Sequence, residues 1–409
     1  MRLLIVTQYF WPEGFSINSV AKSLVENGVE VEVLTCKPNY PSGKVFPGYR
    51  AWDFRSEVHK GVCIHRIPFL PRGSGGGRLA LNYLSFIVSG LLFAPWMLRN
   101  KKYDAIFVYA PSPILQAIPA IFLGWLKGCP VALWVQDLWP ESLSATGNVE
   151  NRLVLKLVER VVRYIYRHTD LLMVQSRAFE APVRALASRT PIVYYPNSVD
   201  DSFAMPVTEE PPPVEGLGAG FIVMFAGNIG AAQAVGVIVA AATLLKENTD
   251  IHFVVLGDGN SRASMLKEAQ QLGLTNFHLP GRFPMETMPA FMKKASALLV
   301  TLADRPIFAA TVPNKVQAYM AAGKPIIACL NGEGARLVVE AGAGFATPAE
   351  DAKALANTIL RLSQLSPEER SKMGENGRRY YQEHFDHGHL VKLLIGHLQS
   401  VCETKESAI

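Results

Sequence analysis

The chain has 409 residues, 49% hydrophobic and 18% charged, which excludes a mainly disordered protein and favours two or more domains. Its net charge of +5 is uneven: residues 1–200 carry 22 Lys and Arg against 14 Asp and Glu, whereas the remaining residues carry 18 against 21. A basic first half indicates an anionic partner, a phospholipid surface or a phosphorylated substrate, and the lack of a dense basic stripe interleaved with aromatic residues argues against nucleic acid.

The chain opens with a short apolar run, Arg2–Thr7, which is expected to form a buried strand. It lacks the basic region and cleavage site of a signal peptide, and the five cysteines are scattered without a C-x-x-C pair, so a reducing, cytoplasmic setting is expected. The next stretch, QYFWPEGFSIN, has aromatic residues, a proline and a single glycine where a dinucleotide-binding protein carries a glycine-rich turn. An NAD-dependent dehydrogenase is therefore disfavoured.

Strands and helices alternate through the first half of the chain. Further strands are expected at Glu30–Thr35, Ala105–Ala110 and Pro130–Val135, and helices at Ser16–Asn27 and Leu153–His168. Buried strands that alternate with helices predict a parallel, doubly wound sheet. Ligands of such sheets bind beyond the carboxyl ends of the strands.

One predicted helix of this half is long enough to cross a bilayer. Residues 79–98, LALNYLSFIVSGLLFAPWML, contain no charge and are flanked by Arg78 and Arg99. Three interpretations remain open: a spanning helix, a helix buried in the first domain, and a helix that lies in the membrane interface. Spanning is disfavoured because both flanks belong to one sheet. We expect the interfacial arrangement, with the protein peripheral on the inner face of the cell membrane.

A segment rich in proline, glycine and acidic residues, 205–220, is expected to link two domains. The strands expected after it are Phe221–Gly230, Ile251–Gly259, Ala297–Leu302 and Pro325–Leu330. The sequence thus predicts an α/β protein with two facing doubly wound domains, residues 1–204 and 221–385, and a substrate cleft between them. The closing segment Pro367–Val401 has helical periodicity, and residues 386–409 are expected to pack back towards the first domain.

Two turns in the second half follow strands and open helices. In GNIGAAQ, Gly227 and Gly230 let backbone N–H groups approach an anion at a helix N-terminus, although a tight turn without a ligand has the same pattern. In GDGNSR, Asp258 is either a ligand or an ordinary turn residue. Two glycine turns at successive strand ends are more informative than either alone.

The stretch TVPNKVQAYMAAGKPIIA is the most specific of the second half. A polar loop leads to a short helix that Gly323 is expected to end. Lys315 falls in the first turn, where a cation opposes the helix dipole unless it serves an anion, which favours a phosphate ligand. Gln317 either hydrogen-bonds a ribose or is a solvated helix residue.

The stretch WVQDLWPES ends a strand of the first half with Asp137. A carboxylate at the carboxyl edge of a sheet can orient a sugar hydroxyl or transfer a proton, and helix capping is the alternative role. His384, His387 and His389 lie far from matching carboxylates, so no metal site is expected.

Together these segments resemble the family 4 glycosyltransferases of GT-B fold. The similarity covers nearly the whole chain and is carried by QYFWPEGFSIN, KPNYPSG, VQDLWPES, YYPNSVD, AGNIGAAQ, GDGN, GRFPMETMPAFMKKASALLV and PNKVQAYMAAGKPIIA. Within the family, the chain is similar to the L-fucosaminyl (N-acetylfucosamine) transferases of bacterial O-antigen and capsule gene sets.

The resemblance implies a retaining, metal-independent enzyme without a cofactor, which moves a sugar from a UDP-sugar to a polyprenyl-pyrophosphate-linked saccharide. It implies that the second domain holds the donor, with Phe283 at the base and Gln317 at the ribose, while the Gly14 N–H faces the phosphates. The implied donor-site residues are Gly14, Gly227, Asn228, Gly230, Gln233, Asp258, Arg282, Phe283, Asn314, Lys315 and Gln317. The candidate catalytic residues are Glu13, Asp137 and Lys315.

The chain also departs from the family pattern. The E-x7-E carboxylates fall on Ala309 and Gln317, the usual Arg and Lys of the second domain on Asn228 and Gln233, and the usual histidine on Gln136. Lys315 is expected to supply the missing positive charge, and Asp137 to act in place of the histidine. The lost carboxylates keep two alternatives open, a sugar-nucleotide 2-epimerase of GT-B fold and a non-catalytic, membrane-associated partner in polysaccharide assembly.

Overall fold

The computed structural model describes residues 1–73, 75–145, 151–205, 209–218 and 220–407. The chain forms two compact units, the first made of Met1–Pro196 with Gly388–Ile409 and the second of Asn197–His387. The boundary therefore precedes the expected one after residue 204. Most of the predicted linker, 205–220, falls within the second unit, and its residues 206–208 and 219 lie outside the described part of the chain.

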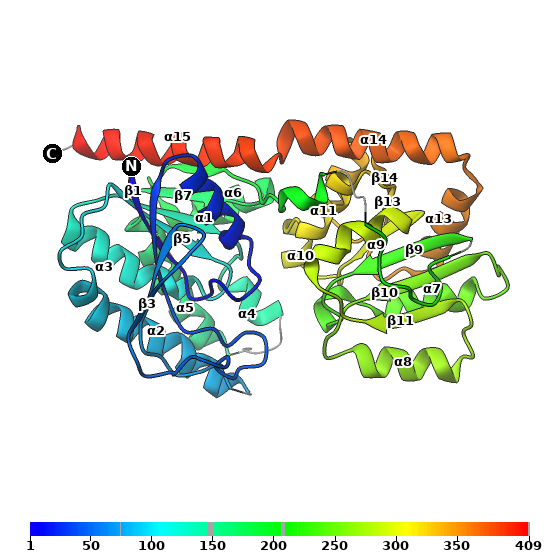
Figure 1. Ribbon diagram of the computed structural model, residues 1–409, viewed down its shortest axis with the longest axis horizontal. Helices are drawn as coiled ribbons and strands as arrows, with labels where there is room; N and C mark the ends of the chain where they lie inside the picture. The colour runs from blue at the N-terminus through cyan, green and yellow to red at the C-terminus, as the bar shows by residue number, and fades with distance from the viewer. Residues whose placement is uncertain (74, 146–150, 206–208, 219, 408–409) are drawn as a thin grey trace. The chain divides into compact units, whose positions relative to one another are not determined.

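The first unit is built on an eight-stranded sheet with the order β3-β4-β2-β1-β5-β6-β7-β8 (Figure 1). The strands are β1 (Arg2–Val6), β2 (Glu30–Thr35), β3 (Arg55–His59), β4 (Val62–Arg66), β5 (Ala105–Ala110), β6 (Val131–Val135), β7 (Leu171–Val174) and β8 (Ile192–Tyr194). All neighbours are parallel except β3 and β4, which form an antiparallel pair at the edge. The predicted doubly wound parallel sheet is confirmed, and the edge hairpin is an addition to it.

Helices cover both faces of this sheet (Figure 1). Apolar residues of α1 (Ile17–Glu26) and α15 (His387–Glu406) share one core with alternate strand residues such as Leu3 and Phe107. The other face carries α2 (Gly76–Met97), α3 (Ala117–Lys127) and α5 (Arg152–Arg167), and the first unit also contains α4 (Glu141–Ala145) and α6 (Glu180–Ala187). The Tyr195 hydroxyl donates to the Leu390 carbonyl at 3.1 Å, so the C-terminal helix α15 is part of the first unit.

The second unit has six parallel strands in the order β11-β10-β9-β12-β13-β14. They are β9 (Phe221–Ala226), β10 (Ile251–Leu256), β11 (Phe277–Gly281), β12 (Ala297–Thr301), β13 (Ile326–Cys329) and β14 (Gly344–Thr347). Its helices are α7 (Gly236–Leu244), α8 (Arg262–Gln271), α9 (Met288–Lys294), α10 (Pro306–Ala310), α11 (Asn314–Ala322), α12 (Glu333–Glu340), α13 (Ala352–Gln364) and α14 (Pro367–His384). Buried hydrophobic clusters on both faces make this a second doubly wound core.

Local sequence signals set several helix ends. Helix α11 ends at Gly323, whose φ of +67° is the left-handed conformation that suits glycine, as the sequence predicts. Helix α14 begins with a capping box in which Ser366 and Glu369 each accept from the other's backbone N–H. The closing segment, for which helical periodicity is predicted, forms two helices, α14 and α15, with a break at residues 385–386.

Helix α2 is neither free-standing nor wholly buried. Its inner face is fixed to the unit because the Asn82 side chain accepts from Gln8 Nε2 at 2.6 Å and donates to the Leu70 carbonyl at 2.6 Å. Gly90 packs so closely on Pro119 that an added Cβ would lie 2.7 Å from the proline ring. The outer face exposes about half or more of each of five apolar side chains: Leu81, Leu84, Val88, Leu92 and Trp96. Helix α2 has the length and composition to cross a membrane, but only 28% of its most apolar window is buried in the protein.

Candidate functional site

The turns after β9 and β10 touch each other in the second unit. Gly257 has a φ of +142°, and an added Cβ would lie 1.8 Å from the Gly227 carbonyl oxygen, so only glycine fits there. The Gly227 N–H donates to the Leu256 carbonyl at 2.9 Å, which continues the sheet pattern. The N–H of Gly227 itself is therefore taken up by the sheet. The N–H groups of Asn228 and Gly230 have no hydrogen-bond partner among the described residues.

Lys315 lies against this turn from the first turn of α11. An added Cβ on Gly227 would lie 2.5 Å from Lys315 Cε, and the Lys315 Nζ is 4.9 Å from the centroid of the Phe225 ring. Within the described part of the chain, no carboxylate forms an ion pair with this ammonium, and burial lowers its pKa to about 8. A cation without a counter-charge in the described chain, next to a turn with two unpaired N–H groups, makes this corner a candidate anion-binding site.

The side chains around this corner are partly engaged with one another. Asn228 Nδ2 donates to Gln233 Oε1 at 3.3 Å, so these two occupy the positions of the usual Arg and Lys as a neutral pair. Asp258 Oδ1 accepts from the Gly259 N–H at 2.9 Å, and the Asp258 carbonyl accepts from the Ile229 N–H at 2.8 Å. Asp258 thus serves as a turn residue, the alternative that the sequence left open.

Other predicted donor residues lie near the same helix or on the next loop. Asn314 Oδ1 accepts from Asn197 Nδ2 at 2.7 Å. The Gln317 side chain is fully buried, and both of its amide atoms lack a hydrogen-bond partner in the described structure. Phe283 is half buried with its ring centroid 4.8 Å from that of Phe291, and Arg282 is exposed. The roles of these residues at the base and ribose stay predictions.

In the first unit, Glu13 joins the loop after β1 to the loop after β2 by hydrogen bonds. Its Oε1 accepts from the N–H groups of Asn39 and Tyr40, both at 2.7 Å, and its Oε2 accepts from the Phe10 N–H at 3.3 Å. Burial raises its pKa to about 7 in spite of these hydrogen bonds. The geometry gives Glu13 a positioning role between the loops after β1 and β2. Gly14 next to it is exposed, with no atom within 4 Å of an added Cβ.

Asp137 follows β6 at the carboxyl edge of the same sheet. Its carboxylate is half buried, and no residue of the described chain forms a hydrogen bond or ion pair with it. Burial raises its pKa to about 7. Gln136 Nε2 and Trp139 Nε1 beside it are also buried without partners in the described structure. A carboxylate with a pKa near neutrality at this edge can accept or donate a proton.

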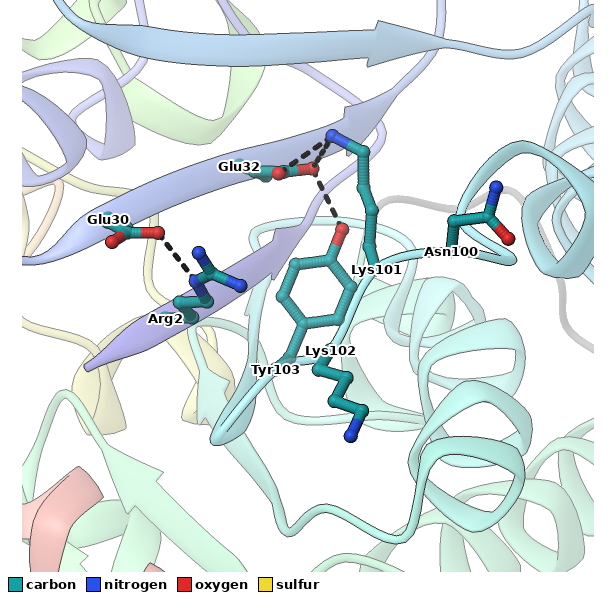
Figure 2. A pocket seen from close by; sticks show the side chains of 7 residues that line it. All are labelled: Arg2, Glu30, Glu32, Asn100, Lys101, Lys102 and Tyr103. Carbon is teal, nitrogen blue, oxygen red and sulfur yellow. Dashed lines mark hydrogen bonds and ion pairs between the residues drawn. The ribbon is translucent and has the colours of Figure 1, made fainter.

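A pocket of about 140 Å³ opens in the first unit (Figure 2). Most of its charges are paired: Arg2 Nε lies 2.6 Å from a Glu30 oxygen, and Glu32 accepts from Lys101 and from the Tyr103 hydroxyl. Arg2 and Glu30 begin β1 and β2, so the pocket lies at the amino ends of the strands. Because ligands of doubly wound sheets bind at the carboxyl ends, this pocket is not the candidate site.

One group of side chains beside this pocket has the composition of a metal site. The ligand atoms of Glu32, Cys63 and His65 lie within 4.8 Å of one another. The Lys101 ammonium, however, lies 2.7 and 2.8 Å from the two Glu32 oxygens and 3.3 Å from His65 Nε2, where a metal cation would have to bind. Although burial opposes it, hydrogen bonds from His65, Lys101 and Tyr103 lower the pKa of Glu32 to about 2. The group is a structural ion-pair network.

Two family models match the chain in succession. Residues 14–198 match the glycosyl transferase 4-like domain, and residues 208–380 match the glycosyl transferases group 1. Together the two matches account for most of both units. The chain belongs to the group 1, or family 4, glycosyltransferases. This family retains the anomeric configuration of the transferred sugar.

Two curated relatives and one solved structure agree with this assignment. WbjE of Pseudomonas aeruginosa, named as a glycosyltransferase, is 28% identical over 319 residues, which cover 75% of this chain and 79% of WbjE. WcaI of Escherichia coli, named as a colanic acid biosynthesis glycosyl transferase, is 26% identical over 350 residues, covering 79% and 82%. Anabaena HepE, solved in complex with UDP and glucose, has a TM-score of 0.69 at 15% identity, covering 97% of this chain and 99% of HepE. This likeness confirms the GT-B fold.

The structure adds residues to this glycosyltransferase site that sequence reasoning did not single out. The rings of Tyr9, Phe15 and Tyr40 form one cluster, with centroids 5.3 Å apart for Tyr9–Phe15 and for Phe15–Tyr40. They come from the loops after β1 and β2, which the motifs QYFWPEGF and KPNYPSG encode. Arg72 lies beside this cluster, with its guanidinium carbon 5.5 Å from the Tyr40 ring centroid. The aromatic residues were visible in the sequence, but their stacking depends on sheet order.

Proposed function

We propose that the enzyme moves a sugar from a UDP-sugar to a lipid-linked saccharide with retention of configuration. The observation that carries this proposal is the Lys315 ammonium, held against Gly227 without a carboxylate partner in the described chain. The free N–H groups of Asn228 and Gly230 lie in the same turn. A diphosphate would satisfy all three groups, and it is the part that every nucleoside-diphosphate sugar has in common.

The chemistry follows from where charge develops. As the bond between the sugar C1 and the diphosphate breaks, negative charge grows on the departing diphosphate, and the acceptor oxygen bonds to C1 on the same face. Lys315 and the N–H groups of its turn are fixed beforehand, so they stabilise that charge without reorganisation. The acceptor hydroxyl loses its proton in this step, and we assign Asp137 as the group of the first unit that receives it. Its pKa of about 7 leaves a large fraction of the carboxylate ionised at neutral pH.

We further propose an amino sugar, N-acetyl-L-fucosamine, as the donor sugar and a polyprenyl-pyrophosphate-linked saccharide of an O-antigen or capsule as the acceptor. The resemblance of QYFWPE, KPNYPSG and VQDLWPES to the L-fucosaminyl transferases supports the sugar. The similarity to WcaI, named for colanic acid biosynthesis, supports a surface polysaccharide as the product.

Helix α2 supports a place on the inner face of the cell membrane. Its exposed apolar side chains form one stripe, since they recur at steps of three and four residues from Leu81 to Trp96. Phe54 of the neighbouring loop packs on Phe93 and Trp96 and adds exposed aromatic surface. Arg78 and several basic residues after the helix flank the stripe. An apolar stripe with basic flanks fits an anionic phospholipid surface.

Donor turnover tests the proposal. The purified protein would be incubated with a panel of UDP-sugars and a membrane lipid extract, and UDP release would be followed. We expect release with one UDP-amino sugar, dependent on the lipid extract and greatly reduced by Lys315→Ala. Lys267→Ala, which removes an exposed lysine of α8, serves as the matched control.

The other outcomes identify the alternatives. Interconversion of UDP-sugars without UDP release would replace the proposal by a 2-epimerase. No turnover of any donor, together with no binding of UDP, would favour a non-catalytic partner in polysaccharide assembly. Near-normal rates for Lys315→Ala would remove this lysine from the site.

A further inference from the structure

Arg72 differs from the other basic residues near α2 because it is half buried and lies at the carboxyl edge of the first sheet. No carboxylate of the described chain forms an ion pair with its guanidinium. Its backbone N–H donates to Asn39 Oδ1 at 3.2 Å, which ties it to the loop after β2. Its guanidinium carbon lies 5.5 Å from the Tyr40 ring centroid. The side chain is thus placed by the fold while its charge stays unpaired.

The surroundings of Arg72 are aromatic and carry unused polar atoms. Tyr40 is part of the ring cluster with Tyr9 and Phe15. The Tyr9 hydroxyl is buried without a hydrogen-bond partner in the described structure. Aromatic faces bind the apolar faces of sugars, and a guanidinium that packs on a ring keeps its N–H edge available for an anion.

The charges of Arg72 and Asp137 both act on the hydroxyl of Tyr83 in α2. Burial raises the pKa of the Tyr83 hydroxyl, and the charges of Arg72 and Asp137 act on it in opposite directions. An acceptor that reaches Asp137 with its hydroxyl would bring its neighbouring groups towards Tyr83 and Arg72.

Arg72 also lies in the connection that leads into α2, a few residues before that helix begins at Gly76. The exposed apolar stripe of α2 starts at Leu81. A molecule with a phosphate between a saccharide and a lipid tail can thus place the saccharide on the aromatic cluster, the phosphate at Arg72 and the tail along the stripe. A free sugar would use only the first of these surfaces.

We propose that Arg72 binds the phosphate of a lipid-linked acceptor, in a subsite that Tyr40 lines. The subsite rests on the proposed function, because it assigns the acceptor of that transfer to a lipid phosphate. Arginine suits this role because its planar fork donates two parallel hydrogen bonds to phosphate oxygens.

Binding of short prenyl compounds to the full-length protein in detergent tests this subsite without knowledge of the natural acceptor. Farnesyl phosphate and farnesol would be titrated against the wild type, Arg72→Gln and Arg189→Gln. Arg189 is an exposed arginine before β8, at the opposite edge of the same sheet, and gives the matched control. We expect Arg72→Gln to weaken farnesyl phosphate binding by about tenfold or more, as the loss of a charged hydrogen-bonded pair would. Farnesol binding, UDP binding and the melting temperature should stay unchanged.

Three results would overturn the subsite. Equal affinity of the wild type and Arg72→Gln for farnesyl phosphate would show that the arginine does not contact the phosphate. Weaker UDP binding in Arg72→Gln would assign the arginine to the donor. Competition by inorganic phosphate at the same concentration as farnesyl phosphate would indicate a site for free phosphate. If Arg72→Gln unfolds, Arg72→Lys keeps the charge without the fork and should show a smaller loss.

The same experiment separates this inference from the proposed function. A wild type that binds farnesyl phosphate through Arg72 but releases no UDP from any donor supports the subsite and contradicts the transfer reaction. A wild type that releases UDP with an acceptor lacking phosphate, at the same rate in Arg72→Gln, supports the transfer and overturns the subsite.

Discussion

Gly227 and Lys315 are in direct contact: an added Cβ on Gly227 would lie 2.5 Å from Cε and 3.0 Å from Nζ of the lysine. The lysine side chain passes over the glycine where other residues would carry a side chain. The ammonium consequently reaches the turn after β9 from a helix that begins almost ninety residues later in the chain. We propose that this contact supplies the positive charge that Asn228 and Gln233, which are neutral, do not bring to the turn.

The Gly227→Ala substitution should therefore damage the donor site more than the fold. Alanine displaces the Lys315 side chain and strains a backbone with φ of +147°, at a cost of about 1–3 kcal/mol in the free energy of unfolding. We expect UDP binding to weaken at least about tenfold, which corresponds to about 1.4 kcal/mol. Calorimetric UDP titration and thermal melts measure the two effects. Gly236→Ala at the start of α7 is the control for the fold, because an added Cβ there meets no atom within 4 Å. A stable Gly227→Ala protein with normal UDP affinity would contradict the contact's role.

Lys315 should also give UDP binding a pH dependence. Burial lowers the pKa of its ammonium to about 8, so the charge that attracts the diphosphate is lost as the pH rises above 8. We expect UDP affinity to fall between about pH 8 and pH 9.5 in the wild type and to stay nearly flat in Lys315→Met. Titrations at several pH values measure this, and a wild type without any decline in that range would remove the lysine from the phosphate site.

Titration of Lys315 should make the fold more stable as the pH rises, whereas it should make UDP binding weaker. Its pKa is lower in the folded protein than in the unfolded chain, so the unfolded chain binds more protons between about pH 8 and pH 10.5. The unfavourable contribution of the buried charge is fully present below pH 8 and is relieved as the pH rises. Lys315→Met should thus raise the melting temperature at pH 7 and have less effect at pH 10.

Strand positions and helix ends could be predicted from the sequence, because local residue patterns determine them. Apolar runs such as Glu30–Thr35 and Ala105–Ala110 became strands with the predicted bounds, and Gly323 ended α11 as expected. The exposed, charged strand β3 escaped notice because an edge strand needs little apolar alternation. Helix α5, predicted at Leu153–His168, is packed mainly near its C-terminal end: Ile165 is buried, but Leu153 and Leu157 are largely exposed. An amphipathic pattern does not show which end of a helix packs against the rest of the protein.

The sequence predicted a residue of the candidate site only where the position of that single residue is unusual by itself. Lys315 stood out because a cation in a first helical turn is unusual, and the structure places it at the turn of Gly227. Arg72 could not be recognised, since its position beside Tyr40 depends on how separate loops of the first unit pack together. Glu13 shows the converse: a carboxylate in a motif reads as catalytic, although its oxygens are occupied by three backbone N–H groups.

The Asp137→Asn substitution should lower the rate of sugar transfer without lowering the stability of the fold. Loss of the proton acceptor is expected to lower the transfer rate by about 10²–10⁴ while UDP binding stays unchanged. Burial raises the pKa of Asp137 to about 7, so the folded protein binds more protons than the unfolded chain between about pH 4 and pH 7. The free energy of unfolding therefore falls as the pH rises through that range. Asp137→Asn should therefore raise the melting temperature at pH 8 relative to the wild type and have less effect at pH 4. Full activity of the Asp137→Asn variant would show that the Asp137 carboxylate is not the proton acceptor.

The apolar stripe of α2 should decide attachment to membranes without affecting the fold. Leu84 and Leu92 are 51% and 63% exposed, so Leu84→Glu with Leu92→Glu costs little in the folded protein. On a bilayer, the double variant loses two leucine contacts, each contributing about 1.5–3 kcal/mol when fully buried, and adds charges of the same sign as an anionic lipid. We expect at least about tenfold weaker sedimentation with phosphatidylglycerol vesicles, whereas Leu244→Glu, at an equally exposed leucine of α7, should bind like the wild type. Equal vesicle binding by all three proteins would show that α2 does not contact lipid.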